Sequence, residues 1–209
     1  MADELFALDP SEFCELLVRW NNLAEAGFAF WEFLPGMRFA ERETWWRAGA
    51  GRGDAHEGLD VCWFRTGGGR RLSLGAGARV PVIYAGEVVS VVDDFLGTSV
   101  FVAHERRDSR GRQLHTIYGH IEPRSGLVSG SLLDVGEAVG TVADTSGRTS
   151  AVPPHLHVTL ALIVGGRLSA TRLDWASLRD PNRAILLNPM SIMSCGADDR
   201  RSPDAPPRG

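Results

Sequence analysis

Histidine is scarce in this chain, and the placement of its six histidines indicates where chemistry could occur. His155 and His157 lie two positions apart, in a stretch whose even-numbered residues from Leu156 to Leu162 are all apolar. Side chains on a β-strand alternate between its two faces. The pattern therefore predicts a strand whose apolar face packs on a core while both imidazoles stand together on the opposite face. There, one imidazole could bind a metal ion and the other could reach a water molecule on it. Two solvent-facing histidines on a sheet are the alternative.

A second arrangement pairs His56 with Asp60, four residues later. On a straight strand this offset would separate the two side chains by about 13 Å, too far to share an ion, but Gly58 between them allows the chain to bend. Two imidazoles and one carboxylate, with one position left for water, form the ligand set of a catalytic zinc site. Cys62 is the nearby residue that could close such a site, which we do not expect because the sequence has no CxxC pair.

His120 lies near the end of a predicted strand, and parity places it on the same face as Thr116 and Tyr118. His115 has the opposite parity and is predicted to be structural. His104 ends another predicted strand. It is also predicted to be structural, and a supporting position behind the site is the alternative.

Strands are the elements expected to position these residues. From Gly49 onward, glycine clusters, β-branched runs and short turns predict an antiparallel all-β unit. A short helix is expected from about Asp174 to Arg179. The expected strands are 80–92, 98–104, 114–121, 138–143 and 155–164.

The N-terminal part has a different character. A helix is predicted between Asp9 as its N-cap and Gly27 as its stop, with Pro10 at the first helical position. The aromatic residues of 28–46 are expected to pack on the main domain, and a ligand-stacking surface is the alternative. We therefore divide the chain into an N-terminal helical, aromatic-rich segment (1–48), a main domain (49–193) and a disordered tail (194–209).

Charge and composition exclude several classes of protein. The chain has 209 residues, 44% of them hydrophobic, and a formal net charge of -4, so disorder throughout and a basic surface for nucleic acid are both excluded. The first residues are acidic, and no apolar run approaches the roughly 20 residues of a membrane span, so neither a signal peptide nor a transmembrane helix is predicted. Three cysteines are too few for a disulfide framework. These features indicate a cytoplasmic protein in a reducing compartment.

Three motifs follow one another along the chain, and they are His56-x-x-x-Asp60, Tyr118-Gly-His120 and His155-x-His157. Together they resemble the signature of the lysostaphin-type, LytM-like zinc metallopeptidases, which cut peptidoglycan peptides. Shorter matches extend this resemblance over roughly residues 49 to 192, and they lie at 84–89, 134–140 and 187–190.

The resemblance implies a compact antiparallel β-sheet domain or sandwich of the duplicated hybrid motif type, with a groove over the metal. It implies His56, Asp60 and His157 as ligands of one catalytic Zn2+ ion. It also implies His120 and His155 as the catalytic pair, one accepting the proton of the attacking water and the other stabilising the oxyanion. Which histidine has which role stays open.

The implied substrate is a peptidoglycan crosslink or a similar small peptide that contains glycine or D-alanine. The implied location is the cell wall or periplasm, in contrast to the cytoplasmic location that the start of the chain indicates. No nucleic acid or membrane partner is expected, and the oligomeric state is left open.

The sequence departs from the family pattern just before His155. Val152, Pro153 and Pro154 stand where the family commonly has a glycine, and the prolines stiffen this approach. Together with the cytoplasmic indication, this departure motivates an alternative function, a zinc- or peptide-binding scaffold or regulator with a LytM-like fold and no turnover. A further hypothesis makes residues 1–48 an inhibitory flap over the groove.

Overall fold

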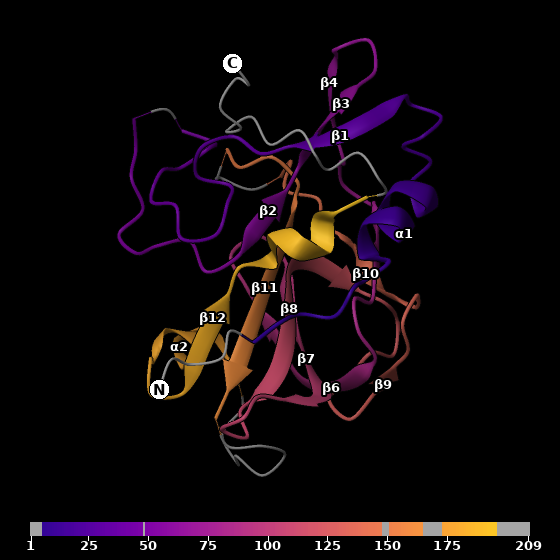
Figure 1. Cartoon of the computed structure of the whole chain (residues 1–209). Helices are drawn as coiled ribbons and strands as arrows, with labels where there is room; N and C mark the ends of the chain where they lie inside the picture. Colours follow the sequence, from indigo (N-terminus) through magenta and orange to yellow (C-terminus); the bar gives the residue numbers. More distant parts are fainter. Residues whose placement is uncertain (1–5, 48, 148–150, 165–172, 196–209) are drawn as a thin grey trace, which may run out of the picture.

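The centre of the molecule is a nine-stranded antiparallel sheet (Figure 1). The computed structural model describes residues 6–47, 49–147, 151–164 and 173–195. The prediction of a mainly β, antiparallel fold is confirmed. The strands of the central sheet are β2 (Leu59–Val61), β5 (Arg79–Pro81), β6 (Gly86–Asp93), β7 (Thr98–Arg107), β8 (Gln113–Pro123), β9 (Leu132–Leu133), β10 (Ala138–Val142), β11 (Leu156–Ile163) and β12 (Ala184–Leu187).

The main path of this sheet runs β12-β11-β8-β7-β6-β9. β2 pairs with β11, while β10 pairs with both β8 and β5. A smaller three-stranded sheet has the order β1-β3-β4, formed by β1 (Phe28–Glu32), β3 (Trp63–Thr66) and β4 (Arg71–Ser73).

Both faces of the central sheet are covered. On β11 the even-numbered residues from Leu156 to Leu160 belong to the larger hydrophobic cluster, as the alternation predicts. Ala161 and Ile163 belong to a smaller cluster on the other face, which includes Leu178 of helix α2 (Trp175–Arg179). All eight residues of β11 are therefore buried, and neither histidine of the His-x-His motif faces bulk solvent.

Helix α2 forms where a short helix was expected. Its N-cap is Asp174, whose Oδ1 accepts hydrogen bonds from the backbone N–H (2.8 Å) and the hydroxyl (2.7 Å) of Ser177. Capping of this kind satisfies backbone donors that have no partner inside the helix.

Helix α1 (Phe13–Trp20) is shorter than the predicted helix at both ends. At its start, the Ser11 hydroxyl rather than Asp9 accepts a hydrogen bond from a backbone N–H, that of Phe13 (3.1 Å). At its end, the Asn21 side chain donates to the carbonyl oxygens of Leu17 and Arg79. Residues 21–27 form turns.

The predicted strand 80–92 is divided into β5 and β6. Between them, the backbone N–H of Ile83 donates to the buried hydroxyl of Tyr118 (2.8 Å) instead of to a neighbouring strand. The other four predicted strands are present with bounds shifted by a few residues. The strands that were not predicted have five residues or fewer, and such short segments carry little periodicity.

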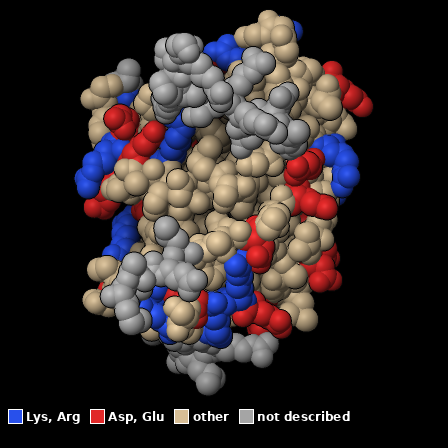
Figure 2. All heavy atoms as spheres, viewed as in Figure 1, with Lys and Arg blue, Asp and Glu red and all other residues tan. Residues whose placement is uncertain are grey.

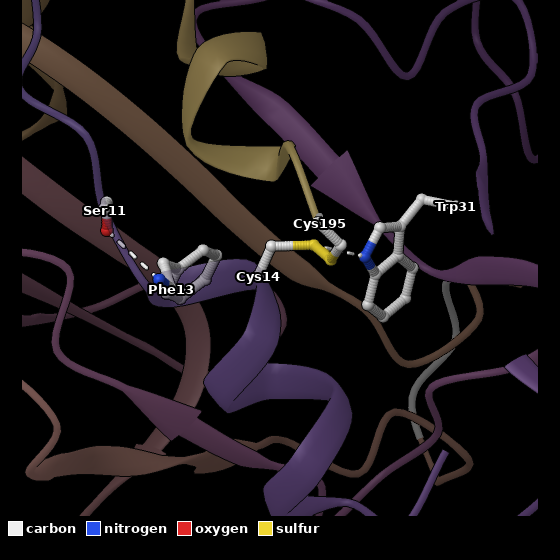
Figure 3. Close-up of a disulfide and its surroundings, with 5 residues drawn as sticks. All are labelled: Ser11, Phe13, Cys14, Trp31 and Cys195. Carbon is white, nitrogen blue, oxygen red and sulfur yellow. Dashed lines mark hydrogen bonds between the residues drawn. A yellow bond between two sulfur atoms is a disulfide. The ribbon is translucent and has the colours of Figure 1, made fainter. Parts of the chain in front are cut away.

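A disulfide joins Cys14 of α1 to Cys195, which follows the 3-10 helix η2 (Pro189–Met193) (Figure 3). The two Cα atoms are 5.4 Å apart, although 181 positions separate the residues in sequence. The Trp31 indole N–H lies 3.2 Å from the Cys14 sulfur. Cys62 is free and buried. Two of the three cysteines therefore pair, contrary to the expectation of a reducing compartment.

The described parts of residues 1–48 share a core with the main domain. Phe13, Leu17 and Trp31 belong to the same hydrophobic cluster as the central strands, and β1 pairs with β3. Whether residues 1–48 form a separate domain stays a prediction. The expected disordered tail lies outside the described residues from 196 onward.

The surface carries both signs of charge. On the face shown in Figure 2, acidic and basic side chains are interspersed around an uncharged centre, and neither sign forms a continuous field. None of the helices in the described ranges is long and apolar enough to cross a membrane.

Glu32 links the three strands of the small sheet. Its carboxylate accepts hydrogen bonds from Arg65 Nη2 (2.8 Å) and from Arg71 Nε (2.6 Å) and Nη2 (2.9 Å). The hydrogen bonds with Arg71 are the main reason that the pKa of Glu32 falls from 4.5 to about 2, against the opposing effect of burial.

The Glu32→Gln variant is expected to be less stable than the wild type near neutral pH, with a difference that shrinks in acid. A carboxyl whose pKa is lowered by folding stabilises the folded state above its unfolded pKa, and this contribution is lost as the pH falls from about 4.5 to about 2. Urea midpoints measured across this range test the prediction. Glu25→Gln, at an exposed turn position, is the control. The same pH dependence in both variants would contradict it.

Candidate metal centre

Three of the residues singled out from the sequence converge in the structure. His56 Nε2 lies 3.2 Å from Asp60 Oδ1, His157 Nδ1 lies 2.7 Å from the same oxygen, and the two nitrogens are 3.2 Å apart. All three side chains are buried. Among the residues that the structure describes, these three form the group whose side chains could hold a metal ion together. Cys62 is not part of it, because its thiol faces the carbonyl of Pro154 (3.5 Å).

Strand pairing explains this convergence. β2 lies antiparallel to β11 with Asp60 directly opposite His157, so the two side chains are cross-strand neighbours. His56 precedes β2, and its backbone is held by two hydrogen bonds, from His56 N–H to the Glu41 carbonyl and from Ala40 N–H to the His56 carbonyl, both 2.9 Å.

Gly58 lies at a bend, as the sequence suggested, and it also contributes space. Its φ is not in the left-handed region, but a Cβ atom there would lie 2.3 Å from the Val158 carbonyl oxygen and 2.8 Å from His157 Nε2. The missing side chain allows β2 to approach β11 closely enough for His56 and Asp60 to meet His157.

We expect Gly58→Ala to destabilise the protein by about 1–3 kcal/mol, the usual cost of overpacking a rigid site, and to weaken metal binding because His157 must move. Gly53→Ala is a matched control, since nothing lies within 4 Å of its added Cβ. Chemical unfolding and zinc titration of both variants provide the measurements. Equal stability and zinc affinity of the two variants would refute this account of Gly58.

Hydrogen bonds on the outer side of each candidate ligand orient it. His56 Nδ1 lies 3.1 Å from the Arg38 carbonyl oxygen, and His157 Nε2 lies 2.9 Å from Thr159 Oγ1. Asp60 Oδ2 accepts hydrogen bonds from the indole of Trp45 (2.7 Å) and from Arg52 (3.1 Å). One polar atom of each side chain is thereby left for a common partner, namely His56 Nε2, His157 Nδ1 and Asp60 Oδ1.

The donor set fits zinc. Tetrahedral zinc with bonds of about 2.0–2.1 Å places neighbouring donors about 3.3 Å apart. The observed separations of 2.7–3.2 Å are shorter than this by about 0.1–0.6 Å. Two imidazole nitrogens and one carboxylate oxygen are ligands that zinc accepts, and three protein ligands leave one coordination position open.

Ionisation also suits metal binding. Burial by itself would raise the pKa of Asp60, but the surrounding imidazoles of His155, His157 and His56 hold it well below its ordinary value. Burial is the main reason that the pKa of His157 falls to about 4. Near neutral pH the site therefore offers a carboxylate and a neutral imidazole, the forms that bind metals.

His155 and His120 stand beside this group. Their ring centroids are 4.9 Å apart, and His155 Nε2 lies 3.5 Å from Asp60 Oδ1. The stiff segment before His155 has a direct role, because the Pro153 carbonyl oxygen lies 2.8 Å from His155 Nδ1. The five predicted site residues thus lie together, while their roles stay a prediction.

A cavity of about 420 Å3 opens beside four of these five residues. Asp60, His120, His155 and His157 contribute to its floor and walls, together with the aromatic side chains of Trp46, Phe95 and Trp175.

The expectation that His120 shares a face with Tyr118 is wrong. Tyr118 points into the main core, whereas the His120 imidazole lies near His157, with ring centroids 5.7 Å apart. Between the pairs Thr98↔Ile121 and Val100↔Tyr118, β8 has one more residue than β7, which is a β-bulge. His120 has φ 61° within it. This extra residue reverses the alternation and turns the imidazole toward the cavity.

The surroundings of the other two histidines favour the structural interpretation. His104 is buried, with Nδ1 2.9 Å from the Ala85 carbonyl oxygen and Nε2 2.8 Å from Thr116 Oγ1. His115 Nδ1 lies 3.0 Å from the Gln113 carbonyl oxygen. Burial lowers the pKa of both imidazoles, that of His115 to about 4.

Several residues of the site were missed from the sequence. Asp94 is not among the residues singled out from the sequence, yet its carboxylate contacts His120 (3.0 Å). Trp45 lies edge-on to His155 and Trp175 to His157, at centroid distances of 5.1 and 5.3 Å. None of these residues has a motif spacing that would have revealed it.

Comparisons with known proteins gave the following. No protein-family model and no curated protein matches the sequence. Among solved structures, the chain is similar to the catalytic domain of a variant of the prophage-encoded protein EnpA from Enterococcus faecalis, with TM-score 0.38 and 24% identity, over 64% of this chain and 85% of that one. It is similar to lysostaphin (TM-score 0.37, 20% identity, 58% of this chain, 42% of that one).

It is also similar to a zinc-containing peptidase from Vibrio cholerae (TM-score 0.40, 22% identity, 59% of this chain, 31% of that one). The matches thus span less than half the length of lysostaphin and of the Vibrio protein. At these values they carry no conclusion about activity, which has to come from the residues of the site.

Proposed function

We propose that this protein is a zinc-dependent endopeptidase of the lysostaphin type. Its substrates would be peptide crosslinks of bacterial peptidoglycan or similar peptides that contain glycine or D-alanine. The observation that best supports this proposal is the convergence of three candidate metal-ligand side chains and two further imidazoles, four of which line one cavity. The substrate class comes from the resemblance of the three sequence motifs to that family.

His56, Asp60 and His157 would hold the zinc ion. Bound there, zinc would lower the pKa of a coordinated water molecule toward about 7 and polarise a scissile carbonyl. Trp45 and Arg52 keep the Asp60 carboxylate in place through its second oxygen.

His120 and His155 face the same space from the side of the cavity. One imidazole would accept a proton from the attacking water and donate it to the leaving amine, and the other would stabilise the negative charge on the carbonyl oxygen. The aromatic side chains around the cavity would reduce the access of bulk water to these groups.

The contacts of residues 1–48 bear on the flap hypothesis. Trp45 donates to Asp60, and the carbonyl oxygens of Arg38 and Glu41 contact the ring and the backbone of His56. These residues therefore support the metal ligands directly, which favours a structural role for the segment over a purely inhibitory one.

The proposal implies action outside the cytoplasm, because peptidoglycan lies there. The Cys14–Cys195 disulfide supports this location, since disulfides persist in oxidising compartments and are rare in cytosolic proteins. The proposed location is thus the cell wall or periplasm.

The decisive experiment measures zinc content together with muropeptide release from purified peptidoglycan. The wild type should bind about one zinc ion per chain and release muropeptides. His155→Ala and His120→Asn should keep the zinc but lose roughly 100- to 10,000-fold in hydrolysis. Asparagine is chosen at position 120 because it tolerates the left-handed backbone there.

Two results would count against the proposal. Unchanged hydrolysis in both variants would remove these histidines from the reaction. Stoichiometric zinc without release from any wall preparation would favour the non-catalytic zinc- or peptide-binding scaffold.

A further inference from the structure

We propose that Asp94 is a positioning residue that holds His120 in the one tautomer able to accept a proton at Nε2. The contact between Asp94 and His120 can be tested without activity, whereas its role in catalysis rests on the proposed peptidase function.

Asp94 contacts His120 through both carboxylate oxygens. Oδ1 lies 3.0 Å from His120 Nδ1, and Oδ2 accepts the backbone N–H of His120 (3.0 Å). An ionised carboxylate only accepts hydrogen bonds, so the hydrogen between the two side chains belongs to Nδ1. In the neutral ring, Nε2 then carries a lone pair.

The carboxylate is itself fixed in place. Oδ1 accepts the backbone N–H groups of Leu96 and Gly97, both at 2.8 Å, and Oδ2 accepts the Ser99 hydroxyl at 2.6 Å. Only 4% of the Asp94 side chain is exposed. Burial would raise its pKa, but the hydrogen bonds with His120 and Ser99 hold the pKa below its ordinary value. Asp94 therefore stays an acceptor near neutral pH.

The turn that carries Asp94 has little freedom to move. A Cβ atom on Gly97 would lie 2.9 Å from the Ala143 side chain and 3.0 Å from the Ile121 carbonyl oxygen. The turn is thus packed directly against the bulge of β8.

The same carboxylate also stabilises the bulge. A left-handed backbone is unfavourable for a residue with a β-carbon, and it persists only where its surroundings fix it. His120 adopts φ 61°, and its N–H is held by Asp94 Oδ2. Asp94 therefore fixes the direction of the imidazole as well as its tautomer.

This arrangement separates the roles of the two histidines. His155 Nδ1 faces a neutral carbonyl oxygen, that of Pro153, whereas His120 Nδ1 faces a carboxylate. A carboxylate stabilises the imidazolium that forms when the ring accepts a proton, and it does so more strongly than a carbonyl. His120 is therefore assigned as the proton acceptor.

His120 would carry one proton from the attacking water to the leaving nitrogen. As the oxygen of the attacking water forms its bond to the carbonyl carbon, one water proton moves to His120 Nε2. When the carbon–nitrogen bond breaks, this proton passes to the leaving nitrogen, and the neutral Nδ1–H tautomer returns.

Asp94→Asn tests the assignment against Asp93→Asn, which removes the same charge at the exposed neighbouring position. On one peptide substrate, Asp94→Asn should lower kcat about 100-fold or more with KM within about twofold, the range expected for losing a well-oriented general base. Zinc content should match the wild type, and Asp93→Asn should keep the wild-type kcat. Wild-type kcat in zinc-loaded Asp94→Asn would overturn the proposal.

Ser99→Ala distinguishes the positioning of His120 by Asp94 from a general effect on the structure of the turn that carries Asp94. It removes the hydrogen bond to Asp94 Oδ2 and the one accepted from the Trp175 indole N–H (3.1 Å), but it leaves both contacts between Asp94 and His120. We expect its kcat to stay within about threefold of the wild type, below the loss typical of general acid–base groups. A loss as large as that of Asp94→Asn would show a structural effect of the turn and overturn the proposal.

A measurement that needs neither bound zinc nor enzymatic activity completes the test. In the zinc-free protein at alkaline pH, where the ring is neutral, imidazole nitrogen chemical shifts should show His120 protonated at Nδ1 in the wild type. The Nε2–H tautomer should become populated in Asp94→Asn. A wild-type ring protonated at Nε2 would overturn the proposal. If the wild type hydrolyses no peptide, the peptidase function fails, and the tautomer still decides whether Asp94 positions His120.

Discussion

The His157→Ala variant is expected to lose more than about 100-fold in zinc affinity and to show no measurable hydrolysis. Loss of groups that merely orient a ligand already costs about 10- to 100-fold in metal affinity or activity, and His157 is one of the three candidate ligands themselves. The variant also removes the closest neighbour of Asp60 Oδ1, at 2.7 Å. Zinc competition with a chromophoric chelator and muropeptide release are the two measurements.

Thr159→Val provides a graded comparison for this prediction. It removes only the hydroxyl that contacts His157 Nε2, so its losses should be smaller than those of His157→Ala. Circular dichroism should show the same strand content in both variants and the wild type. Retention of wild-type zinc affinity and hydrolysis by folded His157→Ala would exclude His157 from the ligand set and with it the candidate metal centre.

The parts of the site that the sequence predicted are those governed by local pattern. Alternation of apolar residues identified the strand that carries His157. The shared site of His56 and Asp60 was expected because Gly58 allows a bend between them, since on a straight strand they would lie about 13 Å apart. These features depend on strand periodicity and short-range spacing, which are properties of the sequence itself. The helix capped by Asp174 is predictable for the same reason.

The parts that could not be predicted depend on contacts between distant segments. One extra residue in β8 reverses the face on which His120 lies, and no feature of the alternation shows where such a bulge occurs. Asp94 reaches His120 across 26 positions, and Trp45 reaches Asp60 across 15. These contacts follow from how the strands pair and which loops pack together.

Gly58 shows that a correct residue can be chosen for an incomplete reason. The bend that the sequence suggested between His56 and Asp60 is present at Gly58, but the structure also requires a position without a side chain at a close approach of two strands. Spacing along one segment contains no information about the backbone of β11 that passes beside it.

Loss of the Cys14–Cys195 disulfide is expected to have the largest effect on stability. A crosslink between residues 181 positions apart greatly restricts the unfolded chain. The chain-entropy relation gives an upper value of about 5 kcal/mol for a closed loop of this length. For a chain of this size, that free energy corresponds to a fall of roughly 10–20 °C in Tm.

Reduction of the wild type and the double variant Cys14→Ala/Cys195→Ala together isolate the contribution of the bond. Reduction keeps every heavy atom of the buried Cys14 side chain, whereas the variant also removes its sulfur, which contacts the Trp31 indole. With zinc held saturating, both should unfold at much lower denaturant than the oxidised wild type, and the variant slightly earlier. Adding reductant to the double variant should change nothing further, because Cys62 is unpaired. Coincident unfolding of the oxidised and fully reduced wild type would contradict a stabilising role for the disulfide.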